Sequence, residues 1–335
     1  MRAVVIDQPG TFRVGEVADP APGPHDIVVR VAACGICGTD LHIIDGEFPP
    51  SPYPLVPGHE FAGTIAAVGD QVTGLHEGQR VAVDPSLFCG RCEYCRIGRG
   101  NLCANWNAIG DTVSGAFAEY VAVPQANAYL IPDDLDFSTA ALIEPLSCAV
   151  HGVDMLGAVT DQRVLVIGAG TMGLLLAQLL RNAGAAEVAV VDRDAGRLDL
   201  AKTVGATVVA TDAADVRGAG FHTAVDATGA VPAIGAAFDS LRRGGTLLVF
   251  GVADGEATIG LSPFRIYNDE IRIIGSMAVL HSYGRAVEIA GAGRADLRSL
   301  IAPAWPLDGF ADAIAAVRSG AVGEGRVKAQ ITPGA

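Results

Sequence analysis

The sequence predicts an α/β protein with an additional β domain, in which a β-barrel region precedes a doubly wound parallel sheet. Short β-branched runs separated by Gly, Pro and Asp fill roughly the first 147 residues. From about residue 160, compact apolar runs alternate with helical patterns, which is typical of a parallel sheet covered on both faces. A chain of 335 residues is long enough for two such domains.

The expected strands of the first part are short and mostly alternate apolar with other residues. They are the runs RAVVI (2–6), DIVVRVAAC (26–34), GTIAAVG (63–69), QRVAVDP (79–85) and FAEYVAVP (117–124). The expected strands of the second part are compact, mainly apolar runs: RVLVI (163–167), EVAVV (187–191), TVVA (207–210), HTAVDA (222–227), GTLLVF (245–250) and IRIIGS (271–276). We therefore expect one domain over 1–150 and a second over 151–275.

Charge and cysteine content limit the functions that the chain can have. A formal charge of −14 would repel nucleic acid and anionic membrane surfaces, so neither is expected as a partner. The first residues show no secretion signal, and clustered thiols suit a reducing compartment in which they hold metal. We expect a cytoplasmic protein. Only Lys202 and Lys328 are lysines, which we interpret as a composition bias without functional meaning.

A glycine-rich loop follows the first apolar strand of the second part. Gly168, Gly170 and Gly173 form G-x-G-x-x-G between that strand and a helical pattern, and the next strand ends on Asp192. Such a loop lets a pyrophosphate approach the backbone at a helix N-terminus, while the acid binds the adenosine ribose. This predicts NAD as cofactor. An ordinary β-α-β turn is the alternative, and Arg193 leaves a role for a 2′-phosphate open.

Four cysteines lie close together in the segment CGRCEYCRIGRGNLC. Cys89, Cys92, Cys95 and Cys103 have the C-x2-C-x2-C-x7-C spacing, and four thiolates suit a closed, tetrahedral structural zinc site. An iron–sulfur site fits less well, because the last spacing is long and no proline follows it.

A second group of metal-binding residue types is dispersed along the chain. It consists of Cys37 in ACGICGTDLH, His59 and Glu60 in PGHEFAG, and Glu144 in ALIEPLSCAVHG. One thiolate, one imidazole and one or two carboxylates would leave an open position on zinc for a water or an alcohol. Each residue alone is ambiguous, so the prediction depends on their occurring together. Cys34 and Cys148 are expected to be packing residues.

Through these motifs the whole chain resembles the zinc-containing medium-chain dehydrogenases, in particular their sorbitol/polyol and threonine dehydrogenase branch. The resemblance implies a GroES-like β-barrel catalytic domain, completed by residues 276–335, and a Rossmann dinucleotide-binding domain. It places the active site in the cleft between them. It also implies one catalytic and one structural zinc per chain and a homo-oligomer, a dimer or a tetramer.

On the metal side, the resemblance implies that Cys37 and His59 bind zinc. Glu60 is then a ligand or an exchangeable carboxylate beside the ion, and Glu144 either binds zinc or holds the water next to it. In the same comparison Asp40 corresponds to an acid that orients His59. Thr39 and His42 correspond to a proton relay.

On the cofactor side, Met172, Asp192 and Arg197 match contacts to the pyrophosphate and adenosine. The segments Phe250–Val252 and Ser276–Ala278 match those that hold the nicotinamide half, so Phe250, Val252 and Met277 are expected to contact the cofactor.

The resemblance implies hydride transfer between a secondary alcohol, a polyol or sugar alcohol, and NAD. The chain reads Gly275-Ser276-Met277-Ala278-Val279-Leu280 where sorbitol dehydrogenases have an arginine-containing segment, which argues against sorbitol itself. A threonine-type or simple alcohol substrate is the alternative on the same machinery. A non-catalytic relative of the fold is disfavoured, because the residues expected to bind zinc are all present.

Overall fold

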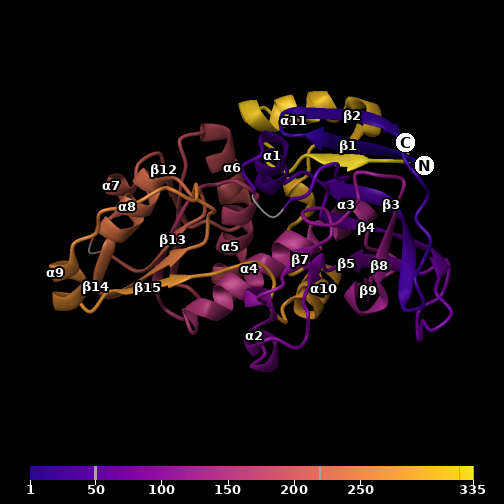
Figure 1. Ribbon diagram of the computed structural model, residues 1–335. Coiled ribbons are helices and arrows are strands. Elements are labelled where there is room, and N and C mark those ends of the chain that lie inside the picture. Colours follow the sequence, from indigo (N-terminus) through magenta and orange to yellow (C-terminus); the bar gives the residue numbers. More distant parts are fainter. Residues whose placement is uncertain (49–50, 219, 324, 335) are drawn as a thin grey trace.

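The computed structural model describes residues 1–48, 51–218, 220–323 and 325–334. Two halves lie side by side: a β-rich half that carries both termini, and a half in which helices cover a parallel sheet (Figure 1). Among the described residues, no helix has both the length and the apolar character needed to span a membrane.

Six parallel strands form the sheet of the second half, in the order β12-β11-β10-β13-β14-β15. They are β10 (Arg163–Ile167), β11 (Glu187–Val191), β12 (Val208–Ala210), β13 (Phe221–Asp226), β14 (Leu241–Val249) and β15 (Arg272–Gly275). These strands confirm the predicted doubly wound sheet. Because the strand order reverses between β10 and β13, a crevice for ligands is expected at the carboxyl ends of these two strands.

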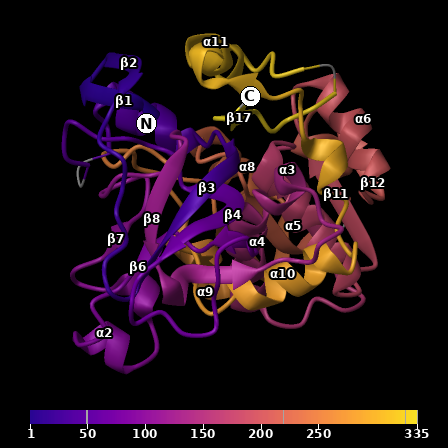
Figure 2. The same cartoon turned by 90° about the vertical axis from the view of Figure 1, so that its right-hand side faces the viewer.

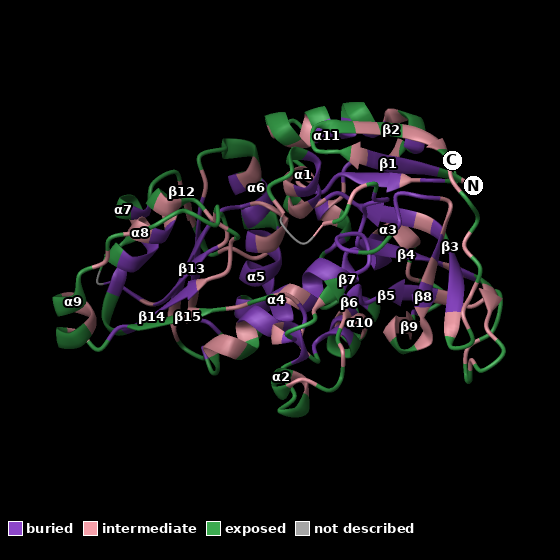
Figure 3. Ribbon diagram, in the orientation of Figure 1, coloured by how far each residue is buried: buried purple, intermediate pink, exposed green. Residues whose placement is uncertain are grey.

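Alternate side chains of these strands enter two different cores, as the geometry of a strand requires. Val164 and Val166 of β10 pack in one core with helices α4 (Ile143–Leu156) and α5 (Thr171–Asn182). Leu165 and Ile167 pack on the other side with α8 (Val231–Asp239). The central strands β10, β11 and β13 are therefore buried on both faces, whereas the edge strands β12 and β15 are more exposed (Figure 3). The remaining helices of this half are α6 (Ala195–Thr203), α7 (Ala213–Val216) and α9 (Pro263–Asn268).

The β-rich half contains a seven-stranded sheet with the path β16-β17-β3-β4-β5-β9, and β8 pairs with β3. Its strands are β3 (Asp26–Gly35), β4 (Glu60–Val68), β5 (Arg80–Val83), β8 (Tyr120–Pro124), β9 (Ala128–Leu130), β16 (Trp305–Pro306) and β17 (Gln330–Thr332). Two short antiparallel pairs accompany it: β1 (Arg2–Gln8) with β2 (Thr11–Glu16), and β6 (Ser86–Leu87) with β7 (Asn107–Ala108). The short helices here are α1 (Gly38–Asp45), α2 (Glu93–Arg96) and α3 (Phe137–Ala140).

The C-terminal part of the chain returns to the β-rich half. Strand β17 pairs antiparallel with β3, so that Ile331 lies opposite Cys34. Helices α10 (Tyr283–Gly291) and α11 (Phe310–Ser319) belong to this return, and α10 packs against α4. The domain boundaries at residues 150 and 275 stay predictions; α4 runs continuously across the first of them.

Candidate active site

A cleft of about 420 Å³ lies between the two halves, and both contribute to its walls. The β-rich half supplies most of the residues expected to bind zinc, and the parallel-sheet half supplies residues expected to bind the cofactor. The sequence-predicted residues that line it are Cys37, Thr39, His42, His59, Glu60, Glu144, Met172, Phe250, Val252 and Met277. Residues from distant parts of the sequence thus meet in one cavity.

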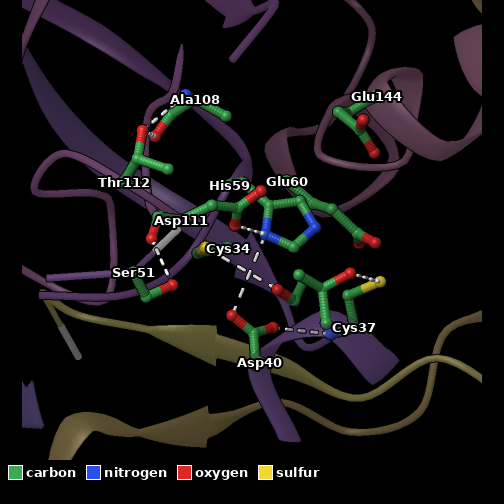
Figure 4. A network of polar contacts seen from close by, with 12 residues as sticks. Cys34, Cys37, Asp40, Ser51, His59, Glu60, Ala108, Asp111, Thr112 and Glu144 are labelled. Atoms are coloured by element: carbon green, nitrogen blue, oxygen red, sulfur yellow. Dashed lines mark hydrogen bonds and ion pairs between the residues drawn. The ribbon is translucent and has the colours of Figure 1, made fainter. Parts of the chain in front are cut away.

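Three of these side chains form a group with the geometry of a metal site. One ligand atom each from Cys37, His59 and Glu60 lies within 4.8 Å of the others. Cys37 caps the N-terminus of α1, whereas His59 and Glu60 lie where the chain enters β4. A thiolate, an imidazole and a carboxylate are a donor set that zinc accepts. Figure 4 shows the side chains of Cys37 and Glu60 near the imidazole of His59, and Glu144 farther away on a different helix.

Glu60 forms an ion pair with Lys328 that is almost completely buried. The two residues are 1% and 3% exposed, and Lys328 Nζ also donates a hydrogen bond to the Ile36 carbonyl, at 2.9 Å. Burial alone would lower the pKa of Lys328, but nearby negative groups, with Glu60 first among them, raise it above its usual value. Gly35 leaves the necessary space, because a Cβ there would lie 2.2 Å from Glu60 Oε2.

Lys328 was not identified as a functional residue from the sequence, where the two lysines were interpreted as a composition bias. The structure shows that one of them neutralises a carboxylate beside the predicted zinc site. The rarity of lysine was a usable signal, but no local motif links position 328 to position 60.

Two carboxylates lie beside the imidazole of His59: Asp40, as the resemblance implied, and Asp111, which lies nearer. Asp111 Oδ1 lies 3.0 Å from His59 Nδ1, and Asp40 Oδ1 lies 3.9 Å away. Asp40 also accepts a hydrogen bond from the Cys37 backbone N–H, at 2.7 Å, and so fixes the start of α1 (Figure 4). The Asp111 contact leaves Nε2 of His59 free for a metal, the usual arrangement for a metal-binding imidazole.

The buried charges shift one another's pKa values. Burial raises the pKa of Asp40 to about 7, and burial likewise raises the pKa of Glu144 to about 7. For His59, burial opposes protonation, but Asp111, Cys37 and Asp40 together outweigh burial and hold the pKa well above its usual value. These carboxyl groups would be more readily ionised beside a cation.

Glu144 lies in the first turn of α4 and outside the group of three ligand atoms. Its Oε1 accepts a hydrogen bond from Cys148 Sγ at 3.3 Å, one helical turn later. Cys34 is fully buried, in line with a packing role. Cys148, also expected to be a packing residue, lines the cleft and contacts a functional carboxylate.

Thr39 and His42 lie on α1 and line the cleft. The Cys37 thiol donates to Thr39 Oγ1 at 3.8 Å, so the hydroxyl is beside the predicted metal ligands. His42 is half-exposed, and its Nδ1 lies 2.8 Å from Glu47 Oε2. The two residues lie three positions apart on α1, Thr39 beside the predicted metal ligands and His42 nearer the solvent.

The four clustered cysteines form a separate lobe around α2, which projects from the β-rich half (Figure 2). All four sulfur atoms lie within 4.8 Å of one another, and Cys92 Sγ and Cys103 Sγ are 3.8 Å apart. Backbone N–H groups of Arg91 and Cys92 lower the pKa of the Cys89 thiol to about 6. The pKa of the Cys92 thiol is lowered as well, so these two cysteines favour thiolate, the form that binds metal, whereas burial raises the pKa of the Cys95 thiol to about 12.

A second cavity, of about 700 Å³, lies at the carboxyl ends of β10, β11 and β13. Gly168, Gly170, Asp192 and Arg197 line it, as the glycine motif predicted, together with Arg193. Gly173 allows close packing of α5, since a Cβ there would lie 1.8 Å from the Gly168 carbonyl oxygen. Sequence reasoning missed Thr228, which follows β13 and lines both this cavity and the cleft.

Asp192 also has a structural part that the sequence did not reveal. Its Oδ2 accepts a hydrogen bond from the Ala169 N–H in the glycine loop, at 2.7 Å, and its Oδ1 accepts one from the Asp194 N–H, at 2.9 Å. The carboxylate therefore joins the end of β11 to the loop that begins α5.

Comparison with known proteins agrees with this arrangement. Residues 23–133 match the family described as alcohol dehydrogenase GroES-like domain, and residues 171–291 match the family described as zinc-binding dehydrogenase. The two matches correspond to the β-rich half and to the parallel-sheet half. The two matches together show that this chain is an enzyme of the dehydrogenase family.

Individual relatives match over almost the whole chain. D-arabinitol dehydrogenase 1 of Uromyces fabae is 35% identical, over 94% of this chain and 93% of its own. L-threonine 3-dehydrogenase of Rhizobium etli is 34% identical, over 97% of both. A Sinorhizobium meliloti structure described as a zinc-binding dehydrogenase bound to NADP superposes with a TM-score of 0.94 at 37% identity, covering 99% of each chain. The chain belongs to the zinc-containing medium-chain alcohol dehydrogenase family.

Proposed function

We propose that this enzyme oxidises a secondary hydroxyl of a polyol or similar small alcohol, with NAD as hydride acceptor. The observation that carries the proposal is that the group of Cys37, His59 and Glu60 shares one cleft with Phe250 and Met277 of the cofactor side. Relatives named for D-arabinitol and L-threonine act on hydroxyls that have polar neighbours, which supports the substrate class.

Polar groups on the cleft wall favour a polyol over a simple alcohol. Ser276 and Trp106 line the cleft, and their Oγ and Nε1 atoms are buried just behind its wall without a hydrogen-bond partner among the described residues. Additional hydroxyls of a polyol can bond to both, whereas a simple alcohol would leave them unpaired, which is unfavourable. A threonine-type substrate is the second candidate, because the surplus of carboxylates in the cleft also suits an ammonium group.

We assign Cys37, His59 and Glu60 as ligands of a catalytic zinc, and the four lobe cysteines as ligands of a structural zinc. When bound in the cleft, zinc lowers the pKa of a substrate hydroxyl. Asp111 fixes the imidazole of His59, and Lys328 holds one oxygen of Glu60. Glu144, outside the ligand group, is placed to accept a hydrogen bond from water or substrate.

Thr39 and His42 provide a path for the substrate proton. The Thr39 hydroxyl lies beside Cys37 inside the cleft, and the half-exposed His42 can pass a proton to solvent. Phe250, Val252 and Met277 form the wall that would hold the nicotinamide, which would supply the hydride acceptor when bound.

Three further expectations stay predictions: that two or four copies assemble, that the protein is cytoplasmic, and that it uses NAD in preference to NADP. The exposed side chain of Ile273, on the sheet-edge strand β15, is compatible with assembly of several copies.

The substrate class is tested by a panel of D-arabinitol, D-altritol, L-threonine and 2-propanol, with NAD reduction followed by absorbance. We expect kcat/KM for a polyol to exceed that for 2-propanol by at least about 100-fold, because a site built to bond a hydroxyl rejects an analogue that lacks it. A preference for 2-propanol would contradict the substrate proposal. A preference for threonine would establish the second candidate.

The two cleft carboxylates should respond differently to removal of their charge. We expect Glu60→Gln to lose the cleft metal and to destabilise the fold by about 3–5 kcal/mol, because Lys328 is left buried without its partner. Glu144→Gln should keep the metal and stability but lose turnover. Metal content by mass spectrometry and urea unfolding distinguish the outcomes, and wild type should contain about two zinc ions per chain.

A double variant, Glu60→Gln with Lys328→Met, is the control for fold damage. It should recover much of the lost stability, because it removes both charges, yet still lack the cleft metal. A full metal content in Glu60→Gln together with metal loss in Glu144→Gln would reverse the two assignments.

Cofactor choice should depend on the charge of Asp192. Wild type is expected to prefer NAD, and Asp192→Asn should reduce the preference over NADP by at least about tenfold, because the variant no longer repels a 2′-phosphate. The amide keeps one acceptor for the glycine loop, so the variant is milder than alanine. Comparable use of NADP by wild type would show that Arg193 and Arg197 dominate, and Arg193→Ala would then restore NAD preference.

A further inference from the structure

The segment between β15 and α10, residues 276–282, crosses from the parallel-sheet half to the β-rich half in a strained backbone conformation. Ala278 and His281 have φ angles of 49° and 52°, in the left-handed region that non-glycine residues rarely occupy. Such conformations persist only where surrounding structure holds them, and they gather at functional sites. Ser276, Met277 and Ala278 form part of the cleft wall.

The contacts that hold this segment come from the four-cysteine lobe. Asn101 Nδ2 donates a hydrogen bond to the Met277 carbonyl at 3.0 Å, and His281 Nε2 lies 3.1 Å from the Gly98 carbonyl. Asn101 is only 3% exposed and lies two residues before the last lobe cysteine, Cys103. Asn101 and Gly98 are more than 170 positions away from Met277 and His281 in the sequence, so both are tertiary contacts.

Both ends of the segment are fixed independently of the lobe. At one end, the Ser276 N–H donates to the Val249 carbonyl of β14, at 3.3 Å. At the other end, Tyr283 is 1% exposed in the core shared with α4, and Val279 is also 1% exposed. Between these anchors, Met277 faces the cleft with an exposed side chain, and its carbonyl is held by Asn101.

We propose that the four-cysteine lobe positions the nicotinamide-side wall of the cleft, and that Asn101 is the positioning residue that connects the two. This inference rests on the proposed function, since the ligand of that wall is the nicotinamide half of the cofactor. The lobe then contributes to cofactor binding as well as to the fold. Loss of the Asn101 donor leaves the Met277 carbonyl unpaired and lets the strained segment relax away from the cleft.

The test compares two probes that differ only at the nicotinamide end. NADH occupies both cavities, whereas ADP-ribose occupies only the pocket at Asp192 and the glycine loop. We expect Asn101→Ala to weaken NADH binding about tenfold, as loss of one buried hydrogen bond implies, with ADP-ribose affinity unchanged. Calorimetric titration measures both dissociation constants.

Asn101→Asp is the sharper variant. It keeps the shape of the side chain but replaces the donor by an acceptor that faces a carbonyl oxygen. A role in space filling alone would leave this variant like wild type, whereas the proposal expects it to weaken NADH at least as much as Asn101→Ala. Arg96→Ala is the matched control on the exposed side of α2, and it should change neither affinity.

His281→Ala keeps the proposal testable if the buried Asn101 variants do not fold, because His281 is exposed. It should weaken NADH several-fold and leave ADP-ribose unchanged. Equal losses for both probes, or unchanged NADH affinity in folded variants, would overturn the proposal. A wild-type protein that binds NADH no better than ADP-ribose would instead contradict the proposed cofactor function.

Discussion

The arrangement of the cleft depends on an excess of negative charge that the fold buries at one point. Asp40, Glu60, Asp111 and Glu144 are all less than 10% exposed, and the buried bases His59 and Lys328 lie beside them. Removing carboxylates from water is expensive unless they are paired, so an uncompensated excess of this size would destabilise the fold. The burial that raises the pKa of Asp40 and of Glu144 to about 7 is a direct sign of this cost. In the proposed site, a divalent cation at Cys37, His59 and Glu60 would reduce this excess.

The path of the chain follows from this constraint. The C-terminal strand β17 pairs with β3, and Lys328, two residues before β17, forms an ion pair with Glu60. Helix α4, which packs against the parallel sheet, contributes Glu144 from the other side of the cleft. The charged centre is thus built by five separate stretches of sequence, around residues 40, 59–60, 111, 144 and 328. The cofactor pocket lies next to it because α4 and α5 share a core.

Local patterns in the sequence predicted a large part of this structure. The six apolar runs became β10 to β15, and the glycine loop and the four-cysteine spacing each describe a feature within a few residues of chain. The contacts that orient the site were not predictable in that way. Asp111 reaches His59 across 52 positions and Lys328 reaches Glu60 across 268, so only the tertiary fold shows them. Asp40, expected at the imidazole, lies 3.9 Å from it and also fixes the turn at Cys37.

The central claim, that the buried acid excess is balanced by a cation held by three residues, is tested most directly by anomalous diffraction. Crystals of protein purified without added metal would be measured on both sides of the zinc absorption edge. The account predicts a peak within bonding distance of Cys37 Sγ, His59 Nε2 and a Glu60 oxygen, with Lys328 on the other Glu60 oxygen. A cleft without a peak, or a peak bound by Glu144 in place of Glu60, would contradict it.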